Sequence, residues 1–208
     1  MSQTILITWW AWFIWANFLN IHVPKHPEIT WINCDALTYA WNHEKVDDAV
    51  RNAGNYRFHQ CDINNIGALE KLYTQYKITD CIHFAAESHV DNSIENPWIF
   101  LQTNIMWTNN LLLLHKKYGC NRFHYVGTDE VYGDLPIDQP DLKFTEQTPL
   151  FPHSPYSVSK AWWDMLTHAF ARTYGLDIVI TRCSNNYGPH QDTEKLIPRF
   201  ISLLLEWK

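Results

Sequence analysis

The sequence lacks the features that mark several common classes of protein. Its 16 Lys and Arg residues are outnumbered by 22 Asp and Glu residues and form no basic run, which disfavours nucleic-acid binding. Its five Cys residues are odd in number and include no C-x-x-C pair, which disfavours a disulfide framework and favours reduced thiols in the cytoplasm. Its 11 His residues show no H-E-x-x-H or comparable spacing, so we predict no metal site.

A membrane segment and a signal peptide are also disfavoured. Residues 5–21 are almost uncharged and reach the lower limit of the roughly 17–25 residues that span a bilayer. The residues before them carry no positive side chain, which a signal peptide requires, and Asn17 and Asn20 would lie unfavourably in lipid. We therefore expect a cytoplasmic protein with neither a membrane nor a nucleic-acid partner.

The remaining composition and the residue patterns predict an α/β fold. With 46% hydrophobic and 18% charged residues, the 208-residue chain is typical of a globular domain. Apolar runs predict strands over 4–8, 28–34, 56–62, 80–85, 122–126 and 177–182, and helical patterns cover 13–22, 45–53, 67–77, 97–118 and 156–174. This alternation predicts a Rossmann-type, doubly wound parallel sheet with helices on both faces. We expect 1–208 to form this domain and, because the sequence stops inside a helical pattern, a C-terminal substrate domain to be missing.

The turn after the first strand has the spacing of a dinucleotide-binding loop but not its residues. Trp9, Trp12 and Trp15 follow the spacing G-x-x-G-x-x-G, with Trp at each Gly position. Gly is needed there for the tight turn, for close approach to a pyrophosphate at a helix N-terminus, and for packing. Asp35 lies 20 residues after Trp15, where an acid would hold the adenosine ribose hydroxyls. An ordinary aromatic core segment is the alternative interpretation.

Two short motifs carry candidate catalytic groups. Tyr156 and Lys160 form a Y-x-x-x-K pair on one helix face, where the ammonium would lower the pKa of the phenol from about 10 and make it a base. Such a pair also arises by chance. Thr128, Asp129 and Glu130 follow the fifth predicted strand, which places two acids with separated pKa values at the carboxyl end of a parallel strand. A solvated acidic turn is the alternative.

Five runs of residues match one family in order and spacing. They are D-A-L-T-Y-A at 35–40, H-F-A-A-E-S-H-V-D at 83–91, T-D-E-V-Y-G at 128–133, S-P-Y-S-V-S-K at 154–160 and R-C-S-N-N-Y-G-P at 182–189. Over nearly its whole length the chain resembles the dTDP-glucose 4,6-dehydratase family of the extended short-chain dehydrogenase/reductases. The run T-D-E-V-Y-G is the specific one, because related epimerases lack the two acids.

The resemblance implies a role for each catalytic candidate. Tyr156 takes the proton of the sugar 4-hydroxyl while hydride passes from C4 to NAD, Lys160 tunes Tyr156 and contacts the cofactor ribose, and Thr128 holds the 4-oxygen. Glu130 removes the C5 proton, and Asp129 protonates the departing 6-hydroxyl. Return of hydride to C6 regenerates NAD and leaves a 4-keto-6-deoxy sugar nucleotide, as in dTDP-rhamnose biosynthesis.

The resemblance also implies binding residues and a partner. Positions that match the NAD site are Trp9, Trp12, Phe13, Ile14, Trp15, Asp35, Leu37, Thr38, Asp62, Ile63, Phe84, Ala85, Ala86, Thr103, Tyr156, Lys160 and Asn186. Positions that match the nucleotide-sugar site are Ser88, Thr128, Asn185, Lys195 and Leu196. A homodimer through the helices at 97–118 and 156–174 is implied as well.

Tryptophan replaces small residues of the family at many positions. Gly is the family residue at Trp9, Trp10, Trp12, Trp15, Trp41, Trp107 and Trp207, small residues are usual at Trp162 and Trp163, and Gly127 stands where Ser is commoner. Bulky residues resist the positive φ of a loop Gly, and each overpacking event costs about 1–3 kcal/mol, so the chain is expected to bind NAD poorly. We hypothesise that these positions have UGA codons, which some bacteria read as Gly and others as Trp. TGG codons at Trp9, Trp12 and Trp15 would refute this.

Two other functions stay open. The protein could be another nucleotide-sugar epimerase or dehydratase of the same superfamily, although the pair Asp129 and Glu130 argues against an epimerase. It could also be a degenerate, non-catalytic homologue, which the altered loop favours. The presence of all five catalytic candidates argues against such decay.

Overall fold

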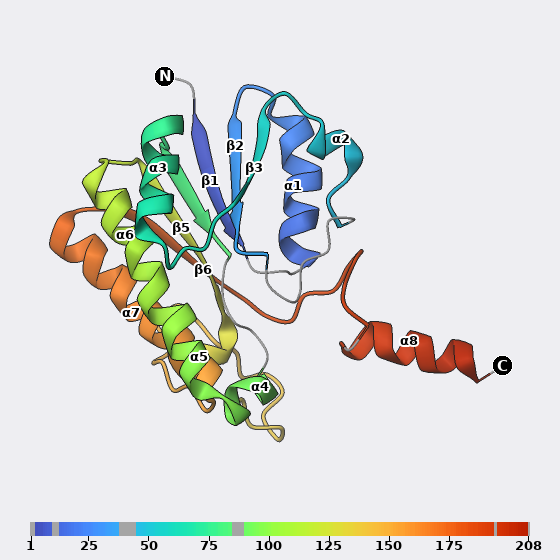
Figure 1. Cartoon of the computed structure of the whole chain (residues 1–208). Coiled ribbons are helices and arrows are strands. Elements are labelled where there is room, and N and C mark those ends of the chain that lie inside the picture. Colours follow the sequence, from blue (N-terminus) through green and yellow to red (C-terminus); the bar gives the residue numbers. More distant parts are fainter. Residues whose placement is uncertain (1–2, 10–12, 38–44, 85–89, 194, 208) are drawn as a thin grey trace.

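The computed structural model describes residues 3–9, 13–37, 45–84, 90–193 and 195–207. Within them, six strands form one sheet in the order β3-β2-β1-β4-β5-β6, and all neighbouring strands are parallel (Figure 1). The strands are β1 (Thr4–Trp9), β2 (Thr30–Asp35), β3 (Tyr56–Gln60), β4 (Asp80–His83), β5 (Arg122–Thr128) and β6 (Asp177–Cys183). The predicted doubly wound parallel sheet is confirmed. The order reverses between β1 and β4, and ligands bind at the carboxyl edge of such switch points.

Helices connect the strands. They are α1 (Phe13–Lys25), α2 (Asp48–Arg51), α3 (Ile66–Tyr76), α4 (Val90–Glu95), α5 (Pro97–Leu101), the π-helix η2 (Gln102–Trp107), α6 (Thr108–Lys117), the 3-10 helix η3 (Asp129–Tyr132), α7 (Pro155–Tyr174) and α8 (Leu196–Glu206). The single helix predicted over 97–118 is three consecutive segments, because a π turn interrupts it. No helix in the described part of the chain is both long enough and apolar enough to cross a bilayer.

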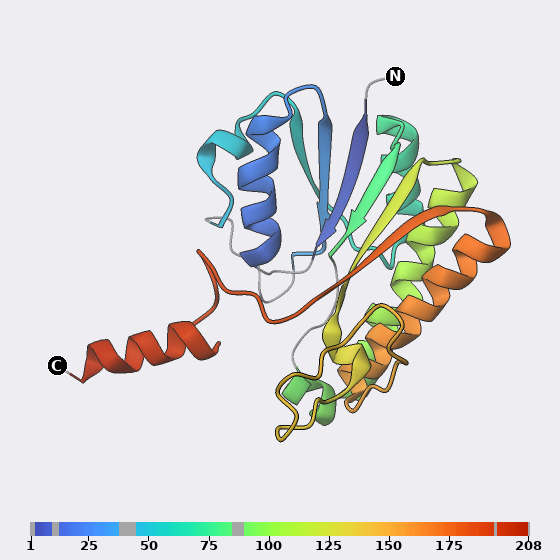
Figure 2. The same ribbon diagram turned by 180° about the vertical axis from the view of Figure 1, so that it is seen from behind.

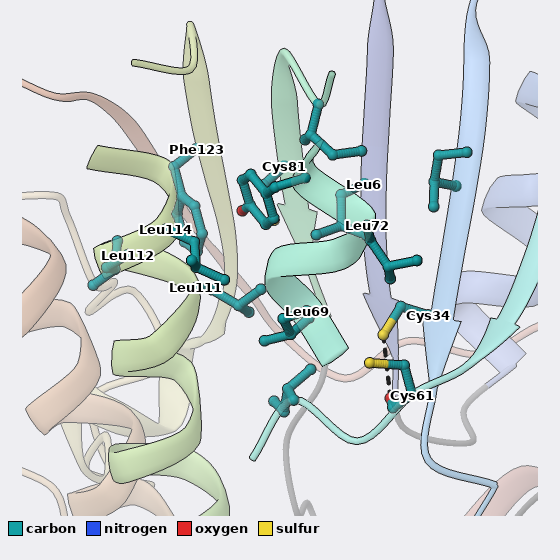
Figure 3. Packing of buried hydrophobic residues seen from close by; sticks show 14 of the residues in the cluster. Leu6, Cys34, Cys61, Leu69, Leu72, Cys81, Leu111, Leu112, Leu114 and Phe123 are labelled. Atoms are coloured by element: carbon teal, nitrogen blue, oxygen red, sulfur yellow. Dashed lines mark hydrogen bonds between the residues drawn. The ribbon is translucent and has the colours of Figure 1, made fainter. Parts of the chain in front are cut away.

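Alternate residues of each strand point to opposite faces of the sheet and build two cores. On one face, Leu6, Ile32 and Cys81 pack with side chains of α3, α6 and α7 (Figure 3). On the other face, Ile5 and Ile7 pack with side chains of α1 and α2. Both faces of a central strand are therefore buried, which explains why the strands are apolar almost throughout.

Two of the unusual tryptophans belong to these cores. Trp15 in α1 is 0% exposed and Trp163 in α7 is 1% exposed. The Trp163 ring stacks on Tyr125, with ring centroids 5.4 Å apart and 25° between the planes. In this structure, replacing either indole with Gly would leave a cavity in the core. Outside the described residues lie Trp10, Trp12 and Trp41.

Local signals fix both ends of α7. The Ser154 hydroxyl accepts from the Ser157 N–H at 3.0 Å, and the Ser157 hydroxyl accepts from the Ser154 N–H at 2.9 Å. Pro155 occupies the first helical turn, and Gly175 ends the helix with φ 70°. These contacts determine the residue at which the helix begins, and they place Tyr156 in its first turn.

The segment after β6 crosses the carboxyl edge of the sheet and contacts α1 and the residues just before α2. The Asn17 side-chain amide donates to the Pro189 carbonyl at 2.9 Å, and Lys45 Nζ lies 2.7 Å from Asp192 Oδ1. Figures 1 and 2 show this segment passing below the carboxyl ends of the strands and leading to α8, which projects from the body. No residue of α8 is buried.

Candidate active site

The turn after β5 and the first turn of α7 bring the catalytic candidates together. The Thr128 hydroxyl accepts from the Glu130 N–H at 3.3 Å and caps η3, which carries both acids. Tyr156 is buried, and its phenol lies near the Thr128 side chain. Burial and then the charge of Glu130 raise the pKa of Tyr156. The phenol, the threonine and Glu130 therefore form one cluster, as the motifs predicted.

The two acids share a partly buried turn. Burial raises the pKa of Asp129. Burial and then the charge of Asp129 raise the pKa of Glu130, and the ammonium of Lys195 opposes that rise. Both carboxyl groups are shifted in the same direction because both lose water, and the expected separation of their two pKa values stays a prediction. Both acids consequently hold a proton to a higher pH than they would in solution.

Lys160 lies beneath this cluster and is 3% exposed. Its ammonium donates to the Val126 carbonyl at 3.2 Å and lies 4.5 Å from the Tyr125 ring centroid. Burial lowers the pKa of Lys160 to about 8, against the opposing charge of Asp164. The expected lowering of the Tyr156 pKa by Lys160 is wrong for this structure, because the ammonium points to Val126 while burial raises the pKa of the phenol.

Positions matched to the cofactor lie along the carboxyl ends of β1 to β4. Asp35 ends β2 and is buried, its Oδ1 accepts from the Leu37 N–H at 2.5 Å, and burial raises its pKa to about 6. Asp62 follows β3, and its Oδ1 accepts from the Asn64 N–H at 2.8 Å. Further described members of the set are Phe13, Ile14 and Trp15 in α1, Ile63 after β3 and Phe84 after β4. Outside the described residues lie Trp12, Thr38, Ala85 and Ala86, and only the backbone is described for Trp9 and Thr103.

Positions matched to the substrate are only partly brought to this site. Asn185 is exposed on the segment after β6, as is its neighbour Asn186, which matches a cofactor position. Lys195 lies close enough to lower the pKa of Glu130. Leu196 opens α8 and is 72% exposed. Ser88 lies outside the described residues.

Comparison with known proteins decides the family. The family model described as GDP-mannose 4,6 dehydratase matches residues 6–207. The chain belongs to this family. The dTDP-glucose 4,6-dehydratase of Mycobacterium tuberculosis is 44% identical over 204 residues, which is 97% of this chain and 59% of that protein. The chain thus spans about three fifths of the length of the curated relatives it matches.

Solved structures agree with this assignment. The Bacillus anthracis dTDP-glucose 4,6-dehydratase in complex with NAD is 42% identical, with a TM-score of 0.88, over 100% of this chain and 63% of that chain. The UDP-glucose 4-epimerase of Thermotoga maritima is 27% identical, with a TM-score of 0.80, over 93% of this chain and 59% of that chain. The resemblance to dTDP-glucose 4,6-dehydratases is confirmed, and the epimerase is less similar to the chain.

The motifs did not predict the buried contacts that His83 makes near the candidate active site. His83 Nδ1 lies 2.5 Å from Thr8 Oγ1, and His83 Nε2 lies 2.9 Å from Thr108 Oγ1. The ring is fully buried, and burial lowers its pKa well below the usual value, so it is neutral. It joins β1, β4 and α6 beside Trp163. The only signal was that His83 begins a matched run.

Proposed function

We propose that the protein containing this chain is an NAD-dependent dTDP-glucose 4,6-dehydratase, a hydro-lyase that releases water from the sugar. The observation that carries the proposal is the acid turn, Thr128 to Glu130, held against the buried Tyr156. With NAD bound to accept hydride, a single phenol base suffices for the reversible oxidation of C4, whereas eliminating water across C5 and C6 needs a further base and a further acid. Relatives named dTDP-glucose 4,6-dehydratase support the choice of substrate.

The described residues fit the adenosine half of NAD. The Asp35 carboxylate at the end of β2 has the chemistry to bind a ribose diol, and the Leu37 N–H fixes its orientation. Phe13 begins α1, whose first N–H groups would face a pyrophosphate. When bound, NAD supplies the hydride acceptor for C4 and the hydride donor for C6.

The side chains of this site account for every proton that moves. Tyr156 takes the proton of the 4-hydroxyl, and Thr128 binds the same oxygen, because the two hydroxyl groups adjoin. Glu130, whose pKa is raised, would take the C5 proton that a ketone at C4 makes acidic, and would return that proton to C5 when hydride adds to C6. Asp129, whose pKa is also raised, keeps a proton and gives it to the 6-hydroxyl, which leaves as water.

The test is the product formed by the full-length protein with Gly at positions 9 and 12. We expect dTDP-glucose to lose one water, detected by mass spectrometry, without net consumption of NAD. Glu130→Gln should keep bound NAD and lose dehydration. A C4 epimer without loss of water would support an epimerase instead, and a protein with neither bound NAD nor product would support a degenerate homologue.

We infer that a second copy of the chain covers the outer face of α7. Val158, Trp162 and Met165 recur at helical spacing on α7 and are 45%, 39% and 57% exposed. On the neighbouring helices, Trp98 and Met106 are 65% and 63% exposed. Such an apolar face supports a homodimer through 97–118 and 156–174. We expect Met165→Glu to turn a dimer into a monomer in light scattering; a wild-type monomer would refute the inference.

We also propose a setting for the protein. Residues 1–208 would form the cofactor-binding domain, and further residues, present in the longer relatives, would complete the substrate site. The five cysteines are free thiols, which supports a reducing cytoplasm. The product would feed dTDP-rhamnose biosynthesis. Cell fractionation and the sugar content of a deletion strain test these two points.

A further inference from the structure

Three side chains of α7 form a column at four-residue spacing. Tyr156, Lys160 and Asp164 are all buried and lie on one face of the helix, toward β5 and β6. The first two belong to the proposed site. Asp164 has no place in the proposed chemistry, although its side chain is only 2% exposed. A carboxylate is removed from water in this way only where other groups compensate its charge.

Arg182 provides part of that compensation. Its Nε donates to Asp164 Oδ2 at 2.6 Å. Its Nη1 donates to the Tyr132 hydroxyl at 2.8 Å, and the guanidinium carbon lies 5.2 Å from the centroid of the Tyr132 ring. Tyr132 is the last residue of η3, the turn that carries the two acids. One guanidinium therefore connects the helix of the phenol to the turn of the acids.

The second oxygen of Asp164 has a different environment. Asp164 Oδ1 has no hydrogen-bond partner among the described residues. It lies 3.6 Å from where a Cβ would stand on Gly127, the strand residue that pairs with Arg182. A Cβ there would also come within 2.9 Å of the Thr181 carbonyl oxygen, so this backbone is shaped for Gly. The charge on Oδ1, which no hydrogen bond from a described residue compensates, can therefore interact with the ammonium of the same column.

That ammonium is Lys160, one turn earlier on α7. Burial disfavours its charge, and Asp164 is the largest opposing influence. Two uncharged groups also stabilise the ammonium: the Val126 carbonyl, which accepts its hydrogen bond, and the ring of Tyr125. The titratable and charged groups around it are Asp164 from α7, Tyr125 from β5, His83 from β4 and Cys183 from β6. Tyr156 lies one turn earlier on α7, and Arg182 contacts Asp164.

We propose that Asp164, held by Arg182, is a positioning residue that keeps Lys160 charged beneath Tyr156, and that Arg182 sets the place of the acid turn relative to α7. The importance of these two effects for dehydration rests on the proposed function. The effect on the charge of Lys160 does not, because it depends only on groups of this chain.

Two substitutions separate this role from plain structural support. Asp164→Asn removes the negative charge beside Lys160, and Arg182→Gln removes the positive charge that balances Asp164. We expect the pH at which the Lys160 amine loses its proton to fall by about 1 in the first variant and to rise in the second. Amine titration by NMR of the full-length protein, with labelled lysine, measures both. A purely structural pair would lower the melting temperature in both variants and move the titration in neither, which would overturn the proposal.

Two milder variants protect the test against misfolding. Tyr132→Phe keeps the ring and removes only the hydroxyl that Arg182 contacts, so we expect kcat for dehydration to fall several-fold while the Lys160 titration stays in place. Asp164→Glu should restore the titration that Asp164→Asn shifts. The control is Arg122→Gln, which breaks the exposed pair with Asp177, whose side chains are 58% and 52% exposed, and should change neither readout. An unchanged kcat in Tyr132→Phe would overturn the proposed role of Arg182 in placing the acid turn relative to α7. If the enzyme proves inactive on dTDP-glucose, the titrations still decide the proposed role of Asp164 in keeping Lys160 charged.

Discussion

The half of the molecule built on β5, β6 and α7 and the half built on β1, α1 and β2 carry their chemistry in different ways. In the first half, the groups proposed to act are side chains, such as the phenol of Tyr156 and the carboxyl groups of Asp129 and Glu130. In the second half, much of the expected work falls to backbone N–H groups, which a ligand reaches only where side chains are absent. We therefore expect Trp9 and Trp12 to weaken the second half while leaving the first intact. A site made of side chains tolerates changes around it better than one made of exposed backbone.

The largest expected effect is in the side-chain half. Tyr156→Phe removes the proton acceptor and should lower kcat by roughly 10³-fold, within the range for a general base. Bound NAD and the melting temperature should change little, because the ring stays in place. Tyr174→Phe, at the exposed end of the same helix, is the control and should keep full activity. Equal losses in the two variants would show that the phenol of Tyr156 has no special role.

In the half of the molecule that depends on backbone N–H groups, substitution should improve binding of the cofactor. Replacing Trp9 and Trp12 together with Gly should strengthen NAD binding by about 30-fold or more, because each indole costs about 1–3 kcal/mol where Gly is needed. Isothermal titration calorimetry measures the change. Trp98→Gly, at a 65% exposed position, should leave the affinity unchanged. An unchanged dissociation constant in the double variant would remove the contrast between the two halves.

Two buried histidines extend the comparison to stability. Both ring nitrogens of His83 have hydroxyl partners, whereas neither ring nitrogen of His115 has a hydrogen-bond partner in the described part of the chain. Burial lowers the pKa of His115 to about 4. The unfolded chain, with a His pKa of about 6.5, therefore takes up the proton first, and stability is lost as the pH falls from about 6.5 toward 4.

This difference can be measured by unfolding in urea. Between pH 7 and pH 5, His115 should remove about 2 kcal/mol of stability. In His115→Phe, the loss between these two pH values should shrink by that amount. His168→Gln, at an exposed position, serves as the control. An identical pH dependence in His115→Phe and the original protein would contradict the assignment.

The smallest expected effect concerns the link between the two halves. Lys45 Nζ lies 2.7 Å from Asp192 Oδ1, and the side chains are 9% and 38% exposed. An ion pair of this kind contributes at most about 1 kcal/mol. Lys45→Met should therefore raise KM for the sugar nucleotide no more than about fivefold and leave kcat unchanged. A fall in kcat instead would mean that the segment after β6 also positions the reacting groups.

Features encoded by neighbouring residues could be predicted from the sequence. The alternation of apolar runs gave the sheet, and the four-residue spacing of Tyr156 and Lys160 gave their shared helix face. Contacts between distant side chains could not be predicted in the same way. The contact of Arg182 with Tyr132 spans 50 positions, and the direction of the Lys160 ammonium depends on a carbonyl of β5. Such contacts depend on how the elements pack, and no local pattern records them.

Because of the π turn in η2, the number of residues between Pro97 and Lys117 determines which side chains of this segment reach their partners. Asn104 in this turn donates to Ser159 of α7 at 2.8 Å, and Thr108 just after it contacts His83. Deleting one residue of the turn would restore an ordinary helix and rotate everything after it by about 100°. Asn104 and Thr108 could then no longer reach both partners. Among homologous sequences, single-residue gaps should therefore gather in the surface loops and spare this segment.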